Sequence, residues 1–198
     1  MRAPIHDLHV SNGLTYASLA AGLAAVAASL AGSGRGIAPA LLALCALADT
    51  FDGRFARLFA RTDRQARTGA ETDNLVDALV FGLVPVVVVA RIAPPPSGGW
   101  AVPWWAGAFL YVLAVVVRLG FFAAEEDHAR FVGIPTPAAA LVWSTVLIGS
   151  PSASVCAAVF LSCAAVMVWP VAIPRPRGVG LAAFACWAVG LVIWHLAA

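Results

Sequence analysis

Residues 49–57 read DTFDGRFAR and residues 69–77 read GAETDNLVD, and both acidic stretches lie where long apolar runs meet. Carboxylates are costly beside membrane-spanning segments, so they usually have partners and mark a functional site. Residues three or four positions apart are neighbours on a helix surface. If both stretches are helical, each therefore presents a pair of carboxylates on one face: Asp49 with Asp52, and Asp73 with Asp77.

Four carboxylates that converge across one helix pair would repel each other without a counter-ion. Divalent cations with oxygen ligands are the simplest remedy. Two such ions, roughly 3.5–4 Å apart, suit displacement at phosphorus. The spacing thus predicts a site for two Mg²⁺ or Mn²⁺ ions. The alternative is that the same aspartates cap helices and pair with nearby arginines.

The spacing Asp-x-x-Asp-Gly-x-x-Ala-Arg, followed by Gly-x-x-x-Asp-x-x-x-Asp, resembles the signature of the CDP-alcohol phosphotransferase family of integral membrane enzymes. All eight fixed positions are present, at Asp49, Asp52, Gly53, Ala56, Arg57, Gly69, Asp73 and Asp77. The resemblance implies that the four aspartates bind the two metal ions. It also implies that Asp77 is the catalytic base that takes the proton from the acceptor hydroxyl.

Composition independently indicates a membrane protein. The 198 residues are 62% hydrophobic and only 11% charged, which exceeds what one soluble core could bury. Seven apolar runs are close to the ~20 residues that a spanning helix needs, the fifth being short: about 13–31, 37–59, 71–92, 101–123, 136–149, 152–172 and 178–197. We therefore predict an all-α, polytopic transmembrane bundle of about six to seven spanning helices, forming a single domain over residues 1–198.

Arginine placement predicts the orientation, since basic residues favour the cytoplasmic side. All twelve basic residues are arginine, and the net charge of +2 gives no indication of nucleic-acid binding. With the N-terminus inside, nine arginines fall on the cytoplasmic side: Arg2, Arg54, Arg57, Arg61, Arg64, Arg67, Arg130, Arg175 and Arg177. We expect a multi-pass protein of the inner (cytoplasmic) membrane, with a retained first helix and the carboxylates facing the cytoplasm.

The residues around the carboxylates suit a nucleotide. Gly53 in a helix costs about 1 kcal/mol relative to Ala, which makes sense if a ligand approaches the backbone closely; tight helix packing is the alternative. Ala56 keeps the same face open, and Arg57 offers a planar fork for a diphosphate. By resemblance, the nucleotide-binding set also includes Asn12, Thr15, Asp52 and Gly69.

Three further stretches are similar to the phosphatidylserine synthase branch of the family. Residues 77–85 read DALVFGLVP, residues 131–138 read FVGIPTPA, and residues 167–177 read MVWPVAIPRPR. The resemblance implies transfer of a phosphatidyl group from CDP-diacylglycerol, in the lipid bilayer, to L-serine with release of CMP.

One stretch departs from that branch. Residues 118–123 read RLGFFA, where the branch usually carries Arg-Leu-x-Arg/Lys-Phe-Asn, so a cation and an amide are missing at Phe121 and Ala123. Arg118, Arg130 and Arg175 remain as candidates for binding anionic groups of the donor or acceptor. The alternative for Arg118 is a snorkelling side chain at the membrane surface.

Several alternatives stay open at the level of sequence. The acceptor could instead be glycerol phosphate, inositol phosphate or another polar alcohol, because a different acceptor leaves the metal and nucleotide residues unchanged. The acidic cluster could also bind a permeating cation in a transporter, although transport does not require Gly53, Ala56 or Arg57 at these spacings. Assembly as a homodimer is a further open alternative.

Overall fold

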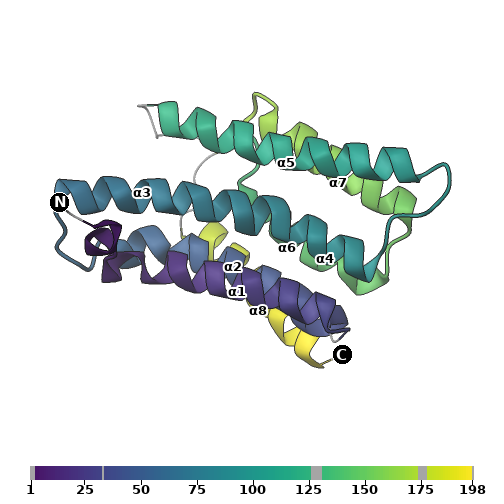
Figure 1. The fold of residues 1–198 in the computed structure, drawn as a ribbon, viewed down its shortest axis with the longest axis horizontal. Coiled ribbons are helices and arrows are strands. Elements are labelled where there is room, and N and C mark those ends of the chain that lie inside the picture. The colour runs from purple at the N-terminus through teal and green to yellow at the C-terminus, as the bar shows by residue number, and fades with distance from the viewer. Residues whose placement is uncertain (1–2, 33, 126–130, 174–177, 198) are drawn as a thin grey trace.

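The computed structural model describes residues 3–32, 34–125, 131–173 and 178–197. Its helices run roughly alongside one another in an elongated bundle (Figure 1). The main helices are α1 (Gly13–Leu30), α2 (Gly34–Ala56), α3 (Asp63–Asp77), α4 (Val84–Ile92), α5 (Ala101–Ala124), α6 (Thr136–Val146), α7 (Ala153–Val168) and α8 (Val179–Ala197). The prediction of an all-α polytopic bundle is confirmed.

Short elements complete the architecture. Two 3₁₀ turns, η1 (Pro4–Asp7) and η2 (Val10–Asn12), precede α1, and η4 (Leu147–Gly149) extends α6. A π-helical segment, η3 (Ala78–Leu83), joins α3 to α4. The strands β1 (Phe131–Val132) and β2 (Ala172–Ile173) form a two-residue antiparallel pair that the sequence did not predict.

The described helices divide into long and short spans. Five are long and apolar enough to cross a membrane: Val10–Leu30, Gly36–Ala56, Asp63–Ile92, Ala101–Ala124 and Val179–Ala197. Two further apolar helices, Thr136–Gly149 and Ala153–Val168, are shorter. The predicted six to seven spanning helices are thus reached only if the two short helices are counted as well. The sequence analysis had already identified the first of them, in the run 136–149, as short.

The third span begins earlier than its hydropathy suggests. The apolar run starts near residue 71, but α3 starts at Asp63. Thr62 caps this start through a reciprocal capping box, in which Gln65 N donates to Thr62 Oγ1 (3.3 Å) and Thr62 N donates to Gln65 Oε1 (2.9 Å). The polar first turns of α3 are therefore helical because of local hydrogen bonds rather than apolar burial.

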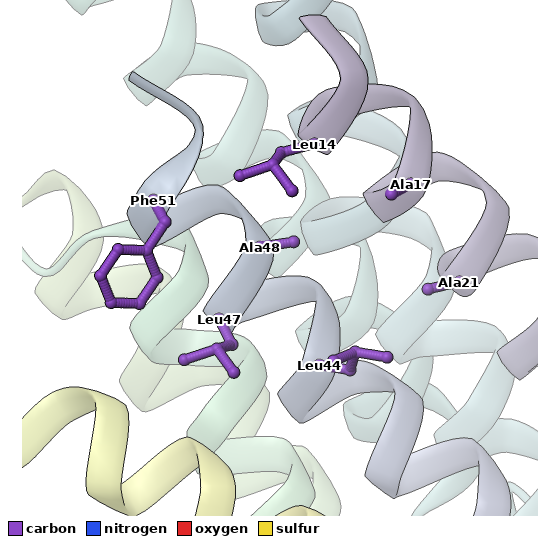
Figure 2. Close-up of a pocket in the computed structure, with 7 residues that line it drawn as sticks. All are labelled: Leu14, Ala17, Ala21, Leu44, Leu47, Ala48 and Phe51. Carbon is purple, nitrogen blue, oxygen red and sulfur yellow. The ribbon is translucent and has the colours of Figure 1, made fainter. Parts of the chain in front are cut away.

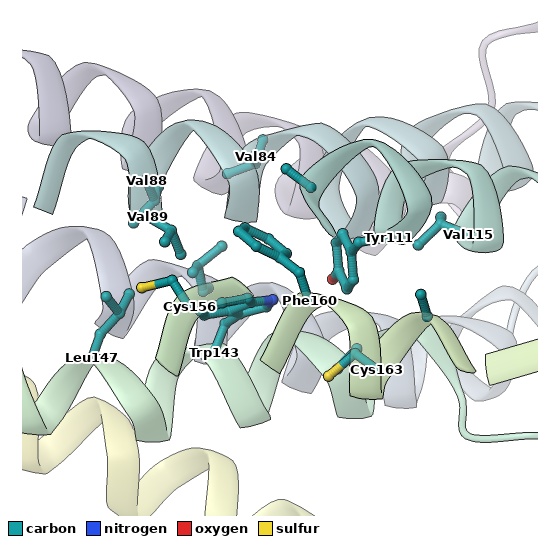
Figure 3. Close-up of a cluster of buried hydrophobic side chains, with 14 of the residues drawn as sticks. Val84, Val88, Val89, Tyr111, Val115, Trp143, Leu147, Cys156, Phe160 and Cys163 are labelled. Atoms are coloured by element: carbon teal, nitrogen blue, oxygen red, sulfur yellow. The ribbon is translucent and has the colours of Figure 1, made fainter. Parts of the chain in front are cut away.

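Packing brings distant segments together around two cores. Helix α1 packs chiefly on α2, α5 on α7, and α2 also on α6 and α8. The larger core gathers side chains mainly from α4, α5, α6 and α7, and some from α2, around the aromatic residues Trp104, Tyr111, Trp143 and Phe160 (Figure 3). The smaller core joins α2, the α3–η3 junction, α6 and α8. Helix α2 therefore contacts both cores and anchors the carboxylates that it carries.

Gly133 provides a test of the packing around the β pair. Its φ is +68°, and a Cβ there would overlap the Met167 carbonyl, so Gly133→Ala adds a backbone clash to conformational strain. Gly178 has a φ of +51°, and no atom of the described residues lies within 4 Å of its Cβ position. Gly178→Ala therefore tests the conformational strain alone, which is typically ~1–2 kcal/mol. Gly149 has neither feature.

We expect thermal melts in detergent to rank the stability loss as Gly133→Ala above Gly178→Ala, with Gly149→Ala near the parent protein. Equal melting temperatures for Gly133→Ala and Gly149→Ala would contradict the packing described here.

Candidate active site

The predicted carboxylates meet at one end of the bundle. Asp49 and Asp52 lie in the last two turns of α2, and Asp73 and Asp77 lie in the last two turns of α3. Both stretches are helical, so the spacing places each pair on one helix face as predicted. All four side chains are partly exposed, which leaves them accessible to a ligand.

The carboxylates pair across the two helices. Asp49 lies within hydrogen-bonding reach of Asp77, and Asp52 lies within reach of Asp73. Each pair joins α2 to α3, and the two pairs are close enough to interact electrostatically. The structure therefore brings together all four residues that the sequence singled out.

Helix α1 and the preceding turn η2 each contribute a polar side chain to the same place. Thr15 Oγ1 donates a hydrogen bond to Asp73 Oδ1 (3.1 Å), and Thr15 is only 5% exposed. Asn12 is equally buried and packs against Gly69, where an added Cβ would lie 2.7 Å from Asn12 Oδ1. Gly69 thus allows α1 and α3 to approach closely, a packing role that its sequence position did not indicate.

The surface at Gly53 is open. Gly53 is exposed, and the nearest atom to a Cβ placed there is Arg57 Nη1, at 3.9 Å. Among the described residues, none packs tightly against Gly53, which favours ligand access over tight helix packing. Ala56 closes α2, and Arg57 follows it with an exposed side chain. A ligand can approach the backbone beside the carboxylates and meet a guanidinium there.

Arg118 approaches the carboxylates from α5. It is 7% exposed, Nε donates to Ile134 O (2.8 Å), and its guanidinium carbon lies 4.4 Å from the Phe122 ring centroid. Its charge interacts favourably with Asp49 and Asp77. This burial beside the acidic cluster favours the anion-binding interpretation of Arg118 over a snorkelling side chain. Arg130 and Arg175 lie outside the described residues.

Comparison with known proteins places this geometry in a family. The family model described as CDP-alcohol phosphatidyltransferase matches residues 8–173. The chain belongs to this family. The match includes the acidic stretches of α2 and α3 together with Asn12, Thr15 and Arg118.

Curated relatives agree with this assignment. The CDP-diacylglycerol–serine O-phosphatidyltransferase of Mycobacterium tuberculosis (strain ATCC 25618 / H37Rv) is 37% identical over 140 residues, covering 66% of this chain and 46% of the relative. The protein of the same name from Mycobacterium leprae is 34% identical over 140 residues, covering 66% and 43%. The Helicobacter pylori (strain ATCC 700392 / 26695) protein of that name is 34% identical over 99 residues, covering 48% and 38%. The matches span less than half the length of each relative.

The donor set suits the divalent metals that this family uses. Four carboxylates supply only oxygen atoms, which Mg²⁺ and Mn²⁺ prefer over softer ligands. Carboxylates within hydrogen-bonding reach of each other require a proton or a cation between them, and the paired aspartates meet this condition twice. Among the described residues, no three acidic, histidine or cysteine side chains lie close enough together to hold an ion as the structure stands. The residues therefore fit the ions in the type of ligand atom that they supply.

A separate hollow lies on another face of α1 and α2. It measures about 310 Å³ and is lined by Leu14, Ala17, Ala21, Leu44, Leu47, Ala48 and Phe51 (Figure 2). Every lining side chain is apolar, so the hollow suits hydrocarbon and offers nothing to a diphosphate. In α2, Ala48 and Phe51 each come directly before a site aspartate. Because neighbouring residues of a helix point in different directions, the hollow and the carboxylates lie on different faces of α2.

The sequence missed an ion pair that holds the N-terminal segment in place. Arg64 Nε and Nη2 donate to the Asp7 carboxylate at 2.8–3.1 Å, and Asp7 is 8% exposed. This fork ties η1 to the first turn of α3. Its carboxylate, Asp7, lies only five residues before Asn12. No short-range sequence signal links positions 57 residues apart, although the Thr62 capping box would have placed Arg64 on a helix.

The ion pair predicts how the N-terminal segment is held. Arg64→Ala removes the fork, so we expect hydrogen–deuterium exchange in residues 3–12 to rise several-fold while α8 is unchanged. The control Arg67→Ala removes an exposed arginine one turn further along α3 and should leave residues 3–12 protected. The double exchange Asp7→Arg/Arg64→Asp should restore protection. Unchanged exchange in Arg64→Ala would mean that the segment is held by other contacts.

Proposed function

We propose that this chain transfers a phosphatidyl group from CDP-diacylglycerol to the hydroxyl of L-serine, giving phosphatidylserine and CMP. The observation that carries the proposal is the convergence of four aspartates with the open surface at Gly53 and Arg57. An anionic diphosphate requires cations and close access to the backbone, and this end of the bundle offers both. The names of the curated relatives support serine as the acceptor.

The nucleotide end of the donor is assigned to α1 and α2. Gly53 and Ala56 leave space beside the helix, and Arg57 presents two parallel N–H donors suited to phosphate oxygens. Asn12, Thr15, Asp52 and Gly69 complete the proposed nucleotide site. Since Asn12 and Gly69 contact each other, one of their tasks is to keep α1 and α3 together around it.

The reacting end is assigned to α3. Asp77 accepts the proton of the acceptor hydroxyl as that oxygen attacks phosphorus and the bond to CMP breaks. Asp49, Asp52, Asp73 and Asp77 would hold two Mg²⁺ or Mn²⁺ ions, whose chemistry is to neutralise the diphosphate and the departing CMP. We assign the carboxylate of the acceptor to Arg118, and its hydrogen bond to Ile134 O supports this by orienting the guanidinium.

The proposed setting is the cytoplasmic membrane, with the carboxylates facing the cytoplasm. Five arginines cluster where α2 leads into α3, between the last turn of α2 and the first two turns of α3: Arg54, Arg57, Arg61, Arg64 and Arg67. A concentration of basic residues at one end of spanning helices favours the cytoplasmic side. Water-soluble serine and CMP can enter and leave from that side, while the donor remains in the bilayer.

An acceptor assay tests the proposed activity. Purified protein is supplied with CDP-diacylglycerol and, in turn, L-serine, glycerol 3-phosphate or inositol phosphate, and the lipid product is identified by mass. We expect serine to react best. Because Phe121 and Ala123 replace a cation and an amide, the KM for serine should be higher than in a family member that retains both. A preference for a phosphorylated alcohol by more than about tenfold, roughly 1.4 kcal/mol, would refute the serine assignment. Absence of CMP release with every alcohol would refute the transferase proposal itself.

Removal of charge from the cluster tests the role of the aspartates. Chelation of divalent ions should abolish CMP release, and excess Mg²⁺ or Mn²⁺ should restore it. Asp73→Asn should lower kcat/KM by at least about tenfold because it removes one ligand. Asp63→Asn is the matched control, since Asp63 is exposed at the start of the same helix. Full turnover in excess chelator would rule out the metal assignment.

A further inference from the structure

The helix that carries Asp77 changes type immediately after it. Residues Ala78–Leu83 form the π-helical segment η3, and Pro85 follows at the start of α4. Proline has no N–H, so it cannot donate to the carbonyl four residues earlier, which belongs to Phe81. Segments of π-helix are rare and often occur at functional sites. The Phe81 carbonyl, one turn after Asp77, therefore lacks its usual helical partner, the N–H four residues later.

Tyr111 of α5 supplies a donor in its place. Its hydroxyl donates to Phe81 O at 2.7 Å, and both groups are buried. The Tyr111 ring is fully buried and packs against Phe160 and Trp143, with centroid distances of 5.5 and 6.5 Å (Figure 3). Because the ring is held on several sides, the hydroxyl is fixed in position, and it fixes the π-helical segment in turn.

The same bond aligns α5 with the acidic cluster. Arg118 lies seven residues after Tyr111, which returns it to the same face of α5. On the other side of Asp77, Thr15 holds Asp73 from α1. Asp77 thus lies between two fixed points on one helix, and its orientation depends on both.

We propose that Tyr111 is a positioning residue, which sets the orientation of Asp77 through the π-helical segment. This inference rests on the proposed function of Asp77 as the base. Tyr111 is buried in the core, and the residue it contacts, Phe81, lies one helical turn after Asp77. Tyr111 therefore acts through the Phe81 backbone rather than on the substrate. Loss of the hydroxyl leaves the Phe81 carbonyl without this donor and allows the π-helical segment to rearrange, and Asp77 is the first site residue to be displaced.

The test is Tyr111→Phe, which removes only the hydroxyl and keeps the packed ring. Ser144→Ala is the matched control, since Ser144 Oγ also donates to a buried backbone carbonyl, Pro39 O, at 2.9 Å. Pro39 lies ten residues before Asp49 in α2, or about 15 Å along the helix axis. Both variants therefore lose the same kind of hydrogen bond, but only one loss is next to the site.

Two measurements are made on each full-length variant: steady-state CMP release with the best acceptor, and hydrogen–deuterium exchange after long exposure. For Tyr111→Phe we expect kcat to fall roughly tenfold, because small misplacements of a reacting group are costly. The KM for CDP-diacylglycerol should stay within about twofold, since most proposed nucleotide contacts lie on α1 and α2. Exchange should increase in residues 74–83. Ser144→Ala should retain kcat and increase exchange near Pro39 only.

The outcomes separate the two proposals. Equal kcat in both variants, or unchanged exchange in residues 74–83 of Tyr111→Phe, would overturn the positioning role. Failure of Tyr111→Phe to fold would also overturn it, since the hydroxyl would then serve the stability of the whole bundle. The exchange measurement needs no turnover. It therefore tests whether the Tyr111 hydroxyl holds the π-helical segment even if the parent protein releases no CMP. Absence of CMP release from the parent protein would overturn only the proposed function.

Discussion

Electrostatic repulsion among four aspartates is the constraint on which the rest of this structure depends. Asp49 faces Asp77 and Asp52 faces Asp73 across two helices, at the end of a bundle that is otherwise apolar. Such an arrangement is unfavourable alone and becomes favourable with cations between the carboxylates. Arg118 offsets part of the charge from α5, and the partial exposure of all four side chains leaves access for the rest.

The bundle has to hold this end open while its other parts remain closely packed. The aromatic core around Trp143 and Phe160 is fully buried, and α2 connects it to the acidic end. The element that runs from α3 through η3 to α4 is polar where it reaches the cluster and apolar where it enters the core. Its π-helical segment lies at the change between the two environments, so the local geometry of the site and the packing of the core meet in one stretch of backbone.

Local periodicity explains why much of this could be predicted from the sequence. Spacings of three and four residues determined which faces Asp49, Asp52, Asp73 and Asp77 occupy, and apolar runs located most helices. Hydropathy could not detect the polar first turns of α3, which depend on the Thr62 capping box. It also could not detect the pairing of Asp7 with Arg64 or of Tyr111 with Phe81 O, because contacts between distant segments leave no periodic signal. Arg118 was open to two interpretations until its burial was known.

In the proposed site, the residues assigned to the donor and Arg118, assigned to the acceptor, come from different helices. Asn12 contacts Gly69 and Thr15 donates to Asp73, so the N-terminal part of α1 is coupled to α3. Arg118 differs, because it reaches the cluster from α5 and is oriented by Ile134 beyond that helix. The departures from the serine branch, at Phe121 and Ala123, fall on the same end of α5. If Arg118 binds the acceptor as proposed, acceptor choice can change through α5 without disturbing the helices that carry the carboxylates.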